Sequence, residues 1–437
     1  MQLLACVAAT GALMATCVAL SPAAAQNRPD STRVDHADAS ALDVDVVIRR
    51  VLERNPTITA ARAAWSEARA QARQAGSLDD PMVDLMAAPR SLGSSSGVPA
   101  AYRIGVTQGF PIFGQRGLRR DAAEAEARSV GWDLRTAQLD LVQRARTMFA
   151  EYWQIGRAIA LNRELSKLLP ELRRVTLAKY AAGQVGQQEP LQIDAELAMI
   201  DHRAVVLERQ RRVAVATMNV LMHQPAEASL PLPPTDLVLP DTSLVHADLT
   251  PHARALRPEL RAADARVEAS RAQLSLAGRR HFPEPSFGVA YDRFWSEPEL
   301  RTSVGVTMNL PIHFARLSSA KAEAVARLAA SKAQSEALRD SVALEVEIAA
   351  ARLHEQAHDV AIARTRMVPL AERTLHAARA SYEANRTDFL TVLNSLRDLL
   401  QARLEADQSA AMLYQAGADL DRALGIVPAA LEREVTP

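Results

Sequence analysis

One pattern of landmarks occurs twice in this chain, about 200 residues apart. The octapeptide GVTQGFPI at 105–112 returns as GVTMNLPI at 305–312. Two further landmarks recur at an offset of 202 residues: the dipeptide Asn55-Pro56 as Arg257-Pro258, and Tyr180 as Tyr382. Three matches in the same order, at a nearly constant offset, indicate an internal duplication of one structural unit. We therefore expect two similar halves around a pseudo-axis, with the function located between them or along that axis.

The charge and the apolar composition narrow the possible classes of protein. Lys plus Arg and Asp plus Glu both number 51, so the formal net charge is zero. Without a basic excess, the composition does not favour a nucleic-acid partner. Hydrophobic residues make up 48% of the chain but aromatic residues only 4%. An apolar content that is mostly Ala, Leu and Val favours long, closely packed helices over a bulky globular core.

The first 25 residues have the features of a secretory signal peptide. The stretch from Leu3 to Leu20 is apolar, and three alanines at 23–25 offer a small-residue cleavage site. Cys6 and Cys17 both lie inside this segment, so the mature chain is expected to contain no disulfide. Residues 26–42 are polar and are predicted to be disordered.

Two short regions in each half change from helical to strand periodicity. A helical pattern runs from Leu42 to about Ala75. Apolar residues then alternate with small or polar ones around 83–85 and 102–106, and again around 287–291 and 304–310. We expect four strands of about 9–11 residues, the length of a tilted membrane strand. A small soluble hairpin packed on the helices is the alternative interpretation.

A very long helix is predicted after each strand pair. The first runs from about Gln115 to Ala181 and the second from about Arg316 to Ala384, with kinks expected at Pro170 and Pro369. About 66 residues at a rise of 1.5 Å give about 100 Å, more than a globular domain holds. The helical pattern resumes after each break and ends near 222 and 424, so each half should end in a long antiparallel helical hairpin.

The second long helix carries a heptad repeat that is typical of a coiled-coil seam. Its members are Val346, Leu353, Val360 and Met367, with Ala349, Ala363 and Leu370 at the companion positions. The predicted organisation is therefore a first repeat at 43–224, a proline-rich strap at 225–251, a second repeat at 252–427 and a tail at 428–437. Because the smallest single-chain barrels have about eight strands, four membrane strands would require several chains to share one barrel.

From about 42 to 427 the chain resembles the TolC family of outer-membrane efflux proteins. The segment VTQGFPIFGQRGLR at 106–119 is similar to the strand-to-helix junction of the heavy-metal branch, of the cobalt-zinc-cadmium or copper type. The tips Tyr-x-x-Gly at 180–183 and Tyr-x-x-Asn at 382–385 also match. The resemblance implies a mainly α fold with membrane β-structure. Long helical hairpins form a periplasmic tunnel, and four strands per chain contribute to a twelve-stranded barrel shared by a homotrimer.

The resemblance also implies a passive exit duct in the outer membrane rather than an enzyme. Its expected partners are outer-membrane lipid, a periplasmic adaptor and an inner-membrane pump of the RND type, and it needs no cofactor. The expected cargo is metal ions or small toxic compounds. The hairpin tips are the implied adaptor-docking surface, comprising Gly183, Gln184, Val185, Asn385, Arg386 and Thr387.

In the family, a tyrosine before the tip and an arginine after it help to close the tunnel. Tyr382 matches the tyrosine, while Arg386 lies one position from the usual arginine. Thr391 and Asn394 stand where many members carry aspartates, so the double aspartate ring is absent. The remaining gate candidates are Tyr180, Glu189, Asp194 and Asp388. We expect the Tyr382 hydroxyl to bond to the carboxylate of Asp194 or Asp388.

Two other functions are considered. The segment His354-Glu355-Gln-Ala-His358 fits the H-E-x-x-H pattern, in which two histidines on one helical face bind zinc and the glutamate activates water. The corresponding segment of the first half, 152–156, has no ligand, and no third histidine follows the motif as in the extended form. A periplasmic coiled-coil scaffold without transport activity would leave the strands and the signal peptide unexplained together.

Overall fold

The computed structural model describes residues 41–89, 100–242, 249–384 and 386–426. The predicted signal peptide, nearly all of segment 26–42 and the tail at 428–437 lie outside these ranges. Leu42, the last residue of the segment predicted to be disordered, is buried, and its N–H donates to the carbonyl of Leu232 at 2.9 Å. That segment therefore ends earlier than we predicted. None of the helices in the described part of the chain is long and apolar enough to cross a membrane.

The prediction of one continuous helix from Leu42 to Ala75 is wrong. The helix is interrupted at Asn55, which separates α1 (Val44–Arg54) from α2 (Pro56–Ala75). Asn55 precedes a proline, which disfavours helical geometry, and its ψ of 126° is extended. Its side-chain oxygen caps α2 by accepting from the Thr57 N–H at 2.9 Å. Its side-chain amide donates to the carbonyl of Leu221 at 2.8 Å.

The same break occurs in the second half, between α5 (Thr250–Leu256) and α6 (Pro258–Arg279). Arg257 precedes Pro258, and its ψ of 119° is again extended. Its buried guanidinium donates to the carbonyl of Ala423 at 3.0 Å. Leu221 and Ala423 are themselves 202 positions apart, so the duplication extends from the sequence to the hydrogen bonds that anchor each helix break.

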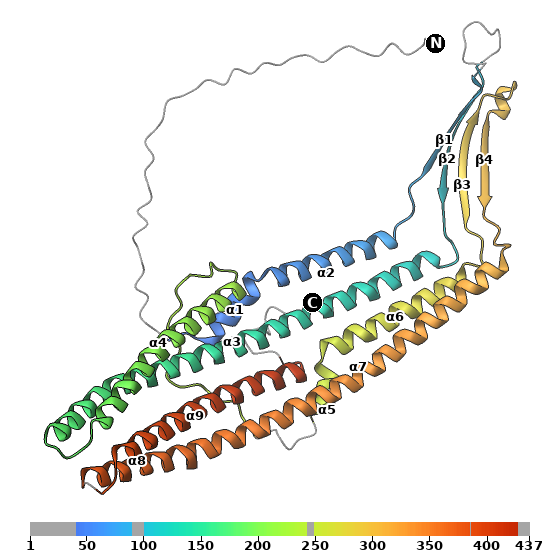
Figure 1. Cartoon of the computed structure of the whole chain (residues 1–437). Helices are drawn as coiled ribbons and strands as arrows, with labels where there is room; N and C mark the ends of the chain where they lie inside the picture. Colours follow the sequence, from blue (N-terminus) through green and yellow to red (C-terminus); the bar gives the residue numbers. More distant parts are fainter. Residues whose placement is uncertain (1–40, 90–99, 243–248, 385, 427–437) are drawn as a thin grey trace, which may run out of the picture. The chain divides into compact units, whose positions relative to one another are not determined.

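The four strands form one antiparallel sheet in the order β1-β2-β3-β4. They are β1 (Met82–Ala87), β2 (Tyr102–Gly109), β3 (Pro285–Asp292) and β4 (Thr302–Met308). At 6, 8, 8 and 7 residues they are shorter than we expected, and residue 310 falls outside β4. Figure 1 shows the sheet beyond the ends of the helices, which excludes the alternative of a hairpin packed on them.

The register of the sheet separates apolar residues from polar and small ones. One row across the four strands consists entirely of valines, at positions 83, 106, 289 and 304. The neighbouring row, on the opposite face, consists of Asp84, Gly105, Ala290 and Ser303. The valines are exposed, with Val304 at 79%. The sheet therefore has one apolar face that no described helix covers.

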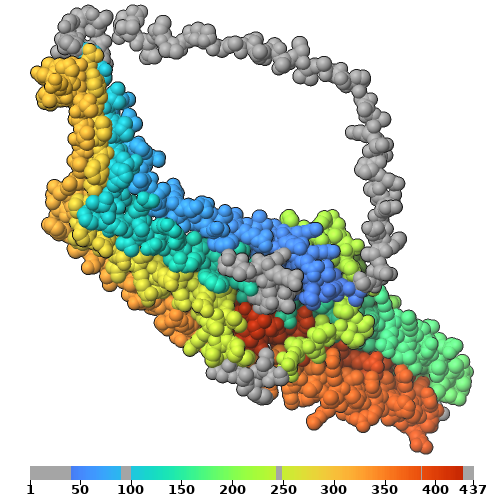
Figure 2. Space-filling view, turned by 180° about the vertical axis from the view of Figure 1, so that it is seen from behind, coloured from blue at the N-terminus to red at the C-terminus, as the bar shows by residue number. Residues whose placement is uncertain are grey.

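The helices form a layer in which neighbours pack side by side. Near the sheet the order is α2, α3 (Gln115–Ala181), α6 and α7 (Phe314–Ile362). Figure 2 shows these four as adjacent bands of blue, teal, yellow-green and orange. Farther from the sheet, α3 packs with α4 (Gln188–Leu221) and with α9 (Phe389–Leu424), which in turn packs with α8 (Val368–Glu383).

The two long helices respond differently to their internal prolines. Helix α3 has the predicted bounds and stays helical through Pro170. The second long helix is interrupted by a π-helical turn, η4 (Ala363–Met367), just before Pro369. Proline cannot donate a backbone hydrogen bond and crowds the preceding turn, so the wider turn relieves that conflict.

The π-helical turn also ends the predicted seam. Val346, Leu353 and Val360 are buried, as are both companion alanines. Met367 and Leu370, however, are 40% and 59% exposed. A wider turn rotates the helix that follows it, so the heptad positions after η4 no longer face the neighbouring helices. The prediction that Met367 and Leu370 belong to the seam is therefore wrong.

The described part of the proline-rich segment, 225–242, contains no helix or strand and crosses two helices. Its prolines lie against glycines. A Cβ at Gly156 on α3 would come within 2.5 Å of Pro233, and one at Gly417 on α9 within 2.8 Å of Pro240. The Tyr152 hydroxyl also donates to the carbonyl of Pro231 at 3.0 Å. Residues 243–248 lie outside the described ranges, and α5 already begins at Thr250, inside the predicted strap.

Candidate functional site at the hairpin tips

The tip between α3 and α4 is closed by a glycine in the left-handed conformation. Gly183 has φ of 69°, and its N–H donates to the carbonyl of Tyr180 at 2.9 Å. The Gln184 N–H donates to the carbonyl of Lys179, also at 2.9 Å. This is the helix C-terminal motif that favours glycine, because a Cβ is strained at positive φ. Gly183 and Gln184 are exposed, and Val185 is half-buried.

The tip between α8 and α9 is closed by an aspartate cap. Asp388 accepts from the N–H of Thr391 at 3.2 Å and from its hydroxyl at 2.6 Å. The bonds from Thr391 lower the pKa of Asp388. Arg386 and Thr387 are exposed, as is Asn394 on α9, whereas residue 385 lies outside the described ranges. Asp388 and Thr391 therefore bond to each other at the start of α9.

Tyr382 joins the two hairpins within the chain. Its side chain is 8% exposed, and its hydroxyl donates to the Oε2 of Glu189 on α4 at 3.0 Å. Burial, together with the bond to Glu189, raises the pKa of Tyr382 to about 12. The prediction that Asp194 or Asp388 accepts from the Tyr382 hydroxyl is therefore wrong. Asp194 instead accepts from Arg173 of α3 at 2.5 Å.

Two further side chains, Lys179 and Phe389, and the backbone carbonyl of Tyr382 complete this contact. The Lys179 ammonium donates to the carbonyl of Tyr382 at 3.1 Å and lies 3.9 Å from its ring centroid. The Phe389 ring meets the Tyr382 ring edge-on at 5.7 Å. We call Lys179, Glu189, Tyr382 and Phe389 the tip cluster. Tyr180, the counterpart of Tyr382 in the first half, is 44% exposed.

Sequence reasoning placed Tyr382 and Glu189 among the gate candidates but missed Lys179 and Phe389. The available signal was their spacing. Lys179 lies one turn before the glycine that ends its helix, and Phe389 opens the helix that follows Tyr382. Neither position could be paired with Tyr382 without knowing how the hairpins pack, because each contact joins elements that are distant in the sequence or separated by the tip.

Above the tip cluster, arginine–carboxylate pairs connect α9 to the first hairpin. Arg397 donates to Glu196 of α4 at 2.6 Å, and the Glu196 side chain is 9% exposed. Closer to the sheet, four more pairs connect α9 to α3: Arg403 with Glu164, Arg157 with Asp407, Arg146 with Asp421, and Arg422 with Asp140. Burial raises the pKa of Asp407 despite its arginine neighbours. The two hairpins are therefore held together by charged pairs along their length.

The metallopeptidase motif lies on α7, away from the tips. His354, Glu355 and His358 are all exposed. Among the residues that the structure describes, no group of three or more His, Cys, Asp or Glu side chains is arranged to hold a metal ion. Within these residues the motif has no third protein ligand, which a catalytic zinc needs.

The chain matches the family model described as "Outer membrane efflux protein" over residues 47–222 and 249–426. The cobalt-zinc-cadmium resistance protein CzcC of Cupriavidus metallidurans is 30% identical over 168 residues, which cover 36% of this chain and 40% of the relative. The chain thus aligns with less than half the length of that relative.

Solved structures share the fold at low sequence identity. A membrane protein from Pseudomonas aeruginosa has a TM-score of 0.75 at 19% identity, with 90% of this chain and 94% of the other covered. CusC, studied for conformational changes in folding and transmembrane channel formation, has a TM-score of 0.76 at 17% identity, with 87% and 92% covered. The outer membrane protein VceC from Vibrio cholerae has a TM-score of 0.73 at 19% identity, with 87% and 96% covered.

Proposed function

Because the chain belongs to the outer membrane efflux protein family, we propose that it is the passive exit duct of a tripartite efflux system. Its family is one of channel proteins, and the chain is not an enzyme. In this proposal an inner-membrane pump, of the RND type, supplies the energy, and a periplasmic adaptor connects the pump to the hairpin tips. The observation that carries the proposal is the two-faced sheet with unpaired outer strands.

The sheet supports a trimer in the outer membrane. Its valine-rich face suits lipid, and its face of small and polar residues suits an aqueous lumen. Within the residues that the structure describes, strands β1 and β4 each have only one partner. In lipid, each unpaired backbone group costs several kcal/mol, so the edges need strands from other copies. Three chains would close a twelve-stranded barrel.

The hairpin tips support the adaptor and gate roles. Gly183, Gln184, Arg386 and Thr387 are exposed at the end of the helices farthest from the sheet, together with half-buried Val185 (Figure 1). With residue 385, these are the proposed adaptor contacts. The tip cluster is the proposed latch, because its hydrogen bond and its cation–π contact join one hairpin to the other. Docking of the adaptor would break these contacts and open the duct.

The proposed cargo is a divalent metal ion, with small toxic compounds as the alternative. The partial similarity to a cobalt-zinc-cadmium resistance protein supports metal export. The test is a gene deletion in the source organism, scored for sensitivity to cobalt, zinc, cadmium and copper, and separately to antibiotics and detergents. Sensitivity to antibiotics alone would refute the metal assignment.

Location and assembly are tested on the same protein. We expect it to fractionate with the outer membrane and to have the mass of a trimer in detergent. Recovery as a monomer in the soluble periplasmic fraction would refute the duct, whatever the deletion phenotype.

A further inference from the structure

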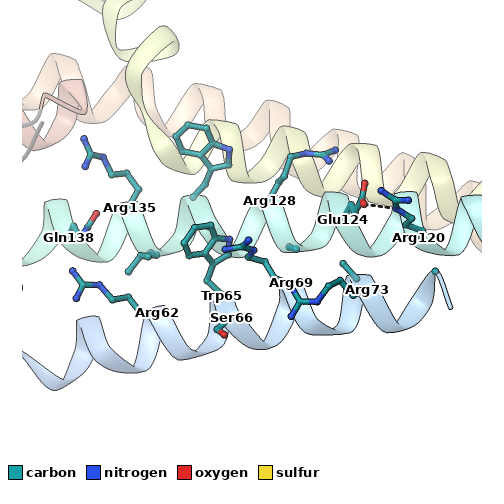
Figure 3. Close-up of a pocket in the computed structure, with 16 residues that line it drawn as sticks. Arg62, Trp65, Ser66, Arg69, Arg73, Arg120, Glu124, Arg128, Arg135 and Gln138 are labelled. Atoms are coloured by element: carbon teal, nitrogen blue, oxygen red, sulfur yellow. Dashed lines mark hydrogen bonds and ion pairs between the residues drawn. The ribbon is translucent and has the colours of Figure 1, made fainter. Parts of the chain in front are cut away.

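A cavity of about 1050 Å³ lies between α2 and α3 and is strongly basic. Two tryptophans, Trp65 and Trp132, line it, and its single carboxylate belongs to Glu124. Figure 3 shows the basic side chains on both of the helices that line it. They are six arginines: Arg62, Arg69, Arg73, Arg120, Arg128 and Arg135. Such an excess is unexpected in a chain with no net charge.

Most of these guanidinium groups have no carboxylate partner. Arg120 pairs with Glu124 at 2.7 Å, and Arg128 pairs with Glu268 of α6 at 2.7 Å. The other four arginines make no ion pair within the described ranges. Arg69 stacks over the Trp65 ring at 5.1 Å, and the Nη1 of Arg135 is buried without a hydrogen-bond partner. Unpaired cations that converge on one cavity repel each other, so an anion bound there would stabilise them.

The cavity is already shaped for a ligand. The Trp65 indole lies against Gly131 of α3, where an added Cβ would come within 2.9 Å of Nε1. At the end nearest the sheet, Arg116 donates to the carbonyl of Gly76 and ties the end of α2 to α3. The side chains of Arg73 and Arg120 lie at this same end, because α2 ends at Ala75 and α3 begins at Gln115.

We propose that Arg69 and Arg73 bind the phosphate group of an anionic phospholipid, whose headgroup enters the sheet-proximal end of the cavity. This proposal rests on the proposed function, since it requires the sheet to lie in the membrane. The helices next to the sheet then meet the periplasmic leaflet, and the acyl chains of the lipid lie along the apolar face of the sheet. Guanidinium forks bind phosphate oxygens in pairs, and basic pockets beside membrane segments bind phospholipid headgroups.

A second copy of the chain is the less suitable occupant. In a closed ring, α2 at one edge of the helical layer would face α7 at the other edge of the next copy. The sheet-proximal part of α7, residues 314–332, contains one acid, Glu323, against four basic residues. They are Arg316, Lys321, Arg327 and Lys332. A neighbour of the same sign cannot neutralise the arginines of the cavity.

The test uses the full-length protein purified in detergent as its native oligomer. Phosphatidylglycerol, cardiolipin and phosphatidylcholine are titrated separately, and bound lipid is counted by native mass spectrometry. We expect both anionic lipids to bind at least tenfold more tightly than phosphatidylcholine. The double variant Arg69→Gln/Arg73→Gln should remove this preference. Arg271→Gln, which removes one exposed arginine at a similar distance from the end of α6, should retain it.

Inorganic phosphate distinguishes the source of the anion. We expect millimolar phosphate not to displace phosphatidylglycerol, because the lipid is also held by its chains. Displacement at that concentration would show that the cavity takes a soluble phosphate and would overturn the lipid assignment. Equal binding of all three lipids, or equal preference in the double variant, would overturn it too. Should the double variant not assemble, Arg73→Gln alone replaces it, with a smaller expected loss of about fivefold.

Failure of this proposal is distinguishable from failure of the proposed function. A trimer from the outer membrane that shows no lipid preference refutes only the lipid site. A soluble monomer refutes the duct and the lipid site together.

Discussion

The bond between Tyr382 and Glu189 gives the sharpest test of the latch. Tyr382→Phe removes the hydroxyl that donates at 3.0 Å and leaves the ring contacts with Lys179 and Phe389 in place. A hydrogen bond to a charged acceptor contributes about 1.5–3 kcal/mol when both groups are buried. Glu189 is only partly buried, so water can replace part of that energy, and about 1 kcal/mol per chain is the better figure.

In a trimer the hydrogen bond between Tyr382 and Glu189 occurs three times, so its free energy is counted three times. Three equivalent bonds would contribute about 3 kcal/mol to the closed state, which corresponds to about a 100-fold change in the equilibrium between closed and open ducts. We therefore expect Tyr382→Phe to raise the mean conductance of single trimers in planar bilayers and to admit large antibiotics into cells. The matched control is Tyr180→Phe, which removes the same hydroxyl from the exposed counterpart of Tyr382 outside the tip cluster. Lys179→Met should act in the same direction as Tyr382→Phe.

The pH dependence of the latch follows from the same pKa. The ordinary pKa of tyrosine is 10.0, and that of Tyr382 is raised to about 12. A raised pKa means that the contribution of the neutral hydroxyl is fully present below pH 10 and is lost as the pH rises toward 12. Conductance should thus not respond to this group between pH 6 and 8. Unchanged conductance in Tyr382→Phe, or a Tyr180→Phe variant that opens the duct equally, would refute the latch.

Three further predictions concern other parts of the chain. Gly183→Glu should abolish resistance while the trimer still forms, whereas Gly183→Asn, which tolerates positive φ, should retain more activity; full resistance in the glutamate variant would exclude this tip from docking. Asn55→Ala should lower the free energy of unfolding by about 2–4 kcal/mol, because it removes a helix cap and a buried bond to Leu221. Asn55→Ser, which keeps the cap, should lose less, as measured by denaturant unfolding in detergent. Glu355→Gln should change neither folding nor efflux, and one zinc bound per chain with proteolysis lost in the variant would reverse that view.

Local patterns predicted the elements of this fold better than their interruptions. Periodicity predicted the bounds of α3 and the positions of all four strands. The spacing of apolar residues along consecutive positions is enough to distinguish a helix from a strand. It missed the break at Asn55, although a residue before proline is a helix boundary signal in its own right. It also missed the π-helical turn before Pro369, whose rotation of the helix exposes Met367 and Leu370.

The candidate site shows where pattern reading stops. Tyr382 was predicted from its place before a tip, but its acceptor was assigned to an aspartate nearby in the sequence or in the repeat. The structure gives Glu189, 193 positions away, because α4 and α8 meet only through the packing of two hairpins. Such a pairing depends on helix rotation and depth, which no local spacing determines. Lys179 was missed for the same reason.

The latch is asymmetric because the two halves of the duplication differ at their tips. At the helix breaks, the two halves make the same contact with different residues: Asn55 and Arg257 both bond to the carbonyl end of their own hairpin. At the tips, the halves differ. Tyr180 is exposed whereas its counterpart Tyr382 is buried, and the position that corresponds to Glu189 is Thr391. The second half therefore supplies the hydroxyl and the first half supplies the acceptor. Such a latch opens only when one hairpin moves relative to the other. A gate built on two copies of one unit therefore requires the copies to differ at their tips. The same gate requires them to remain alike at the helix breaks, where each copy is anchored.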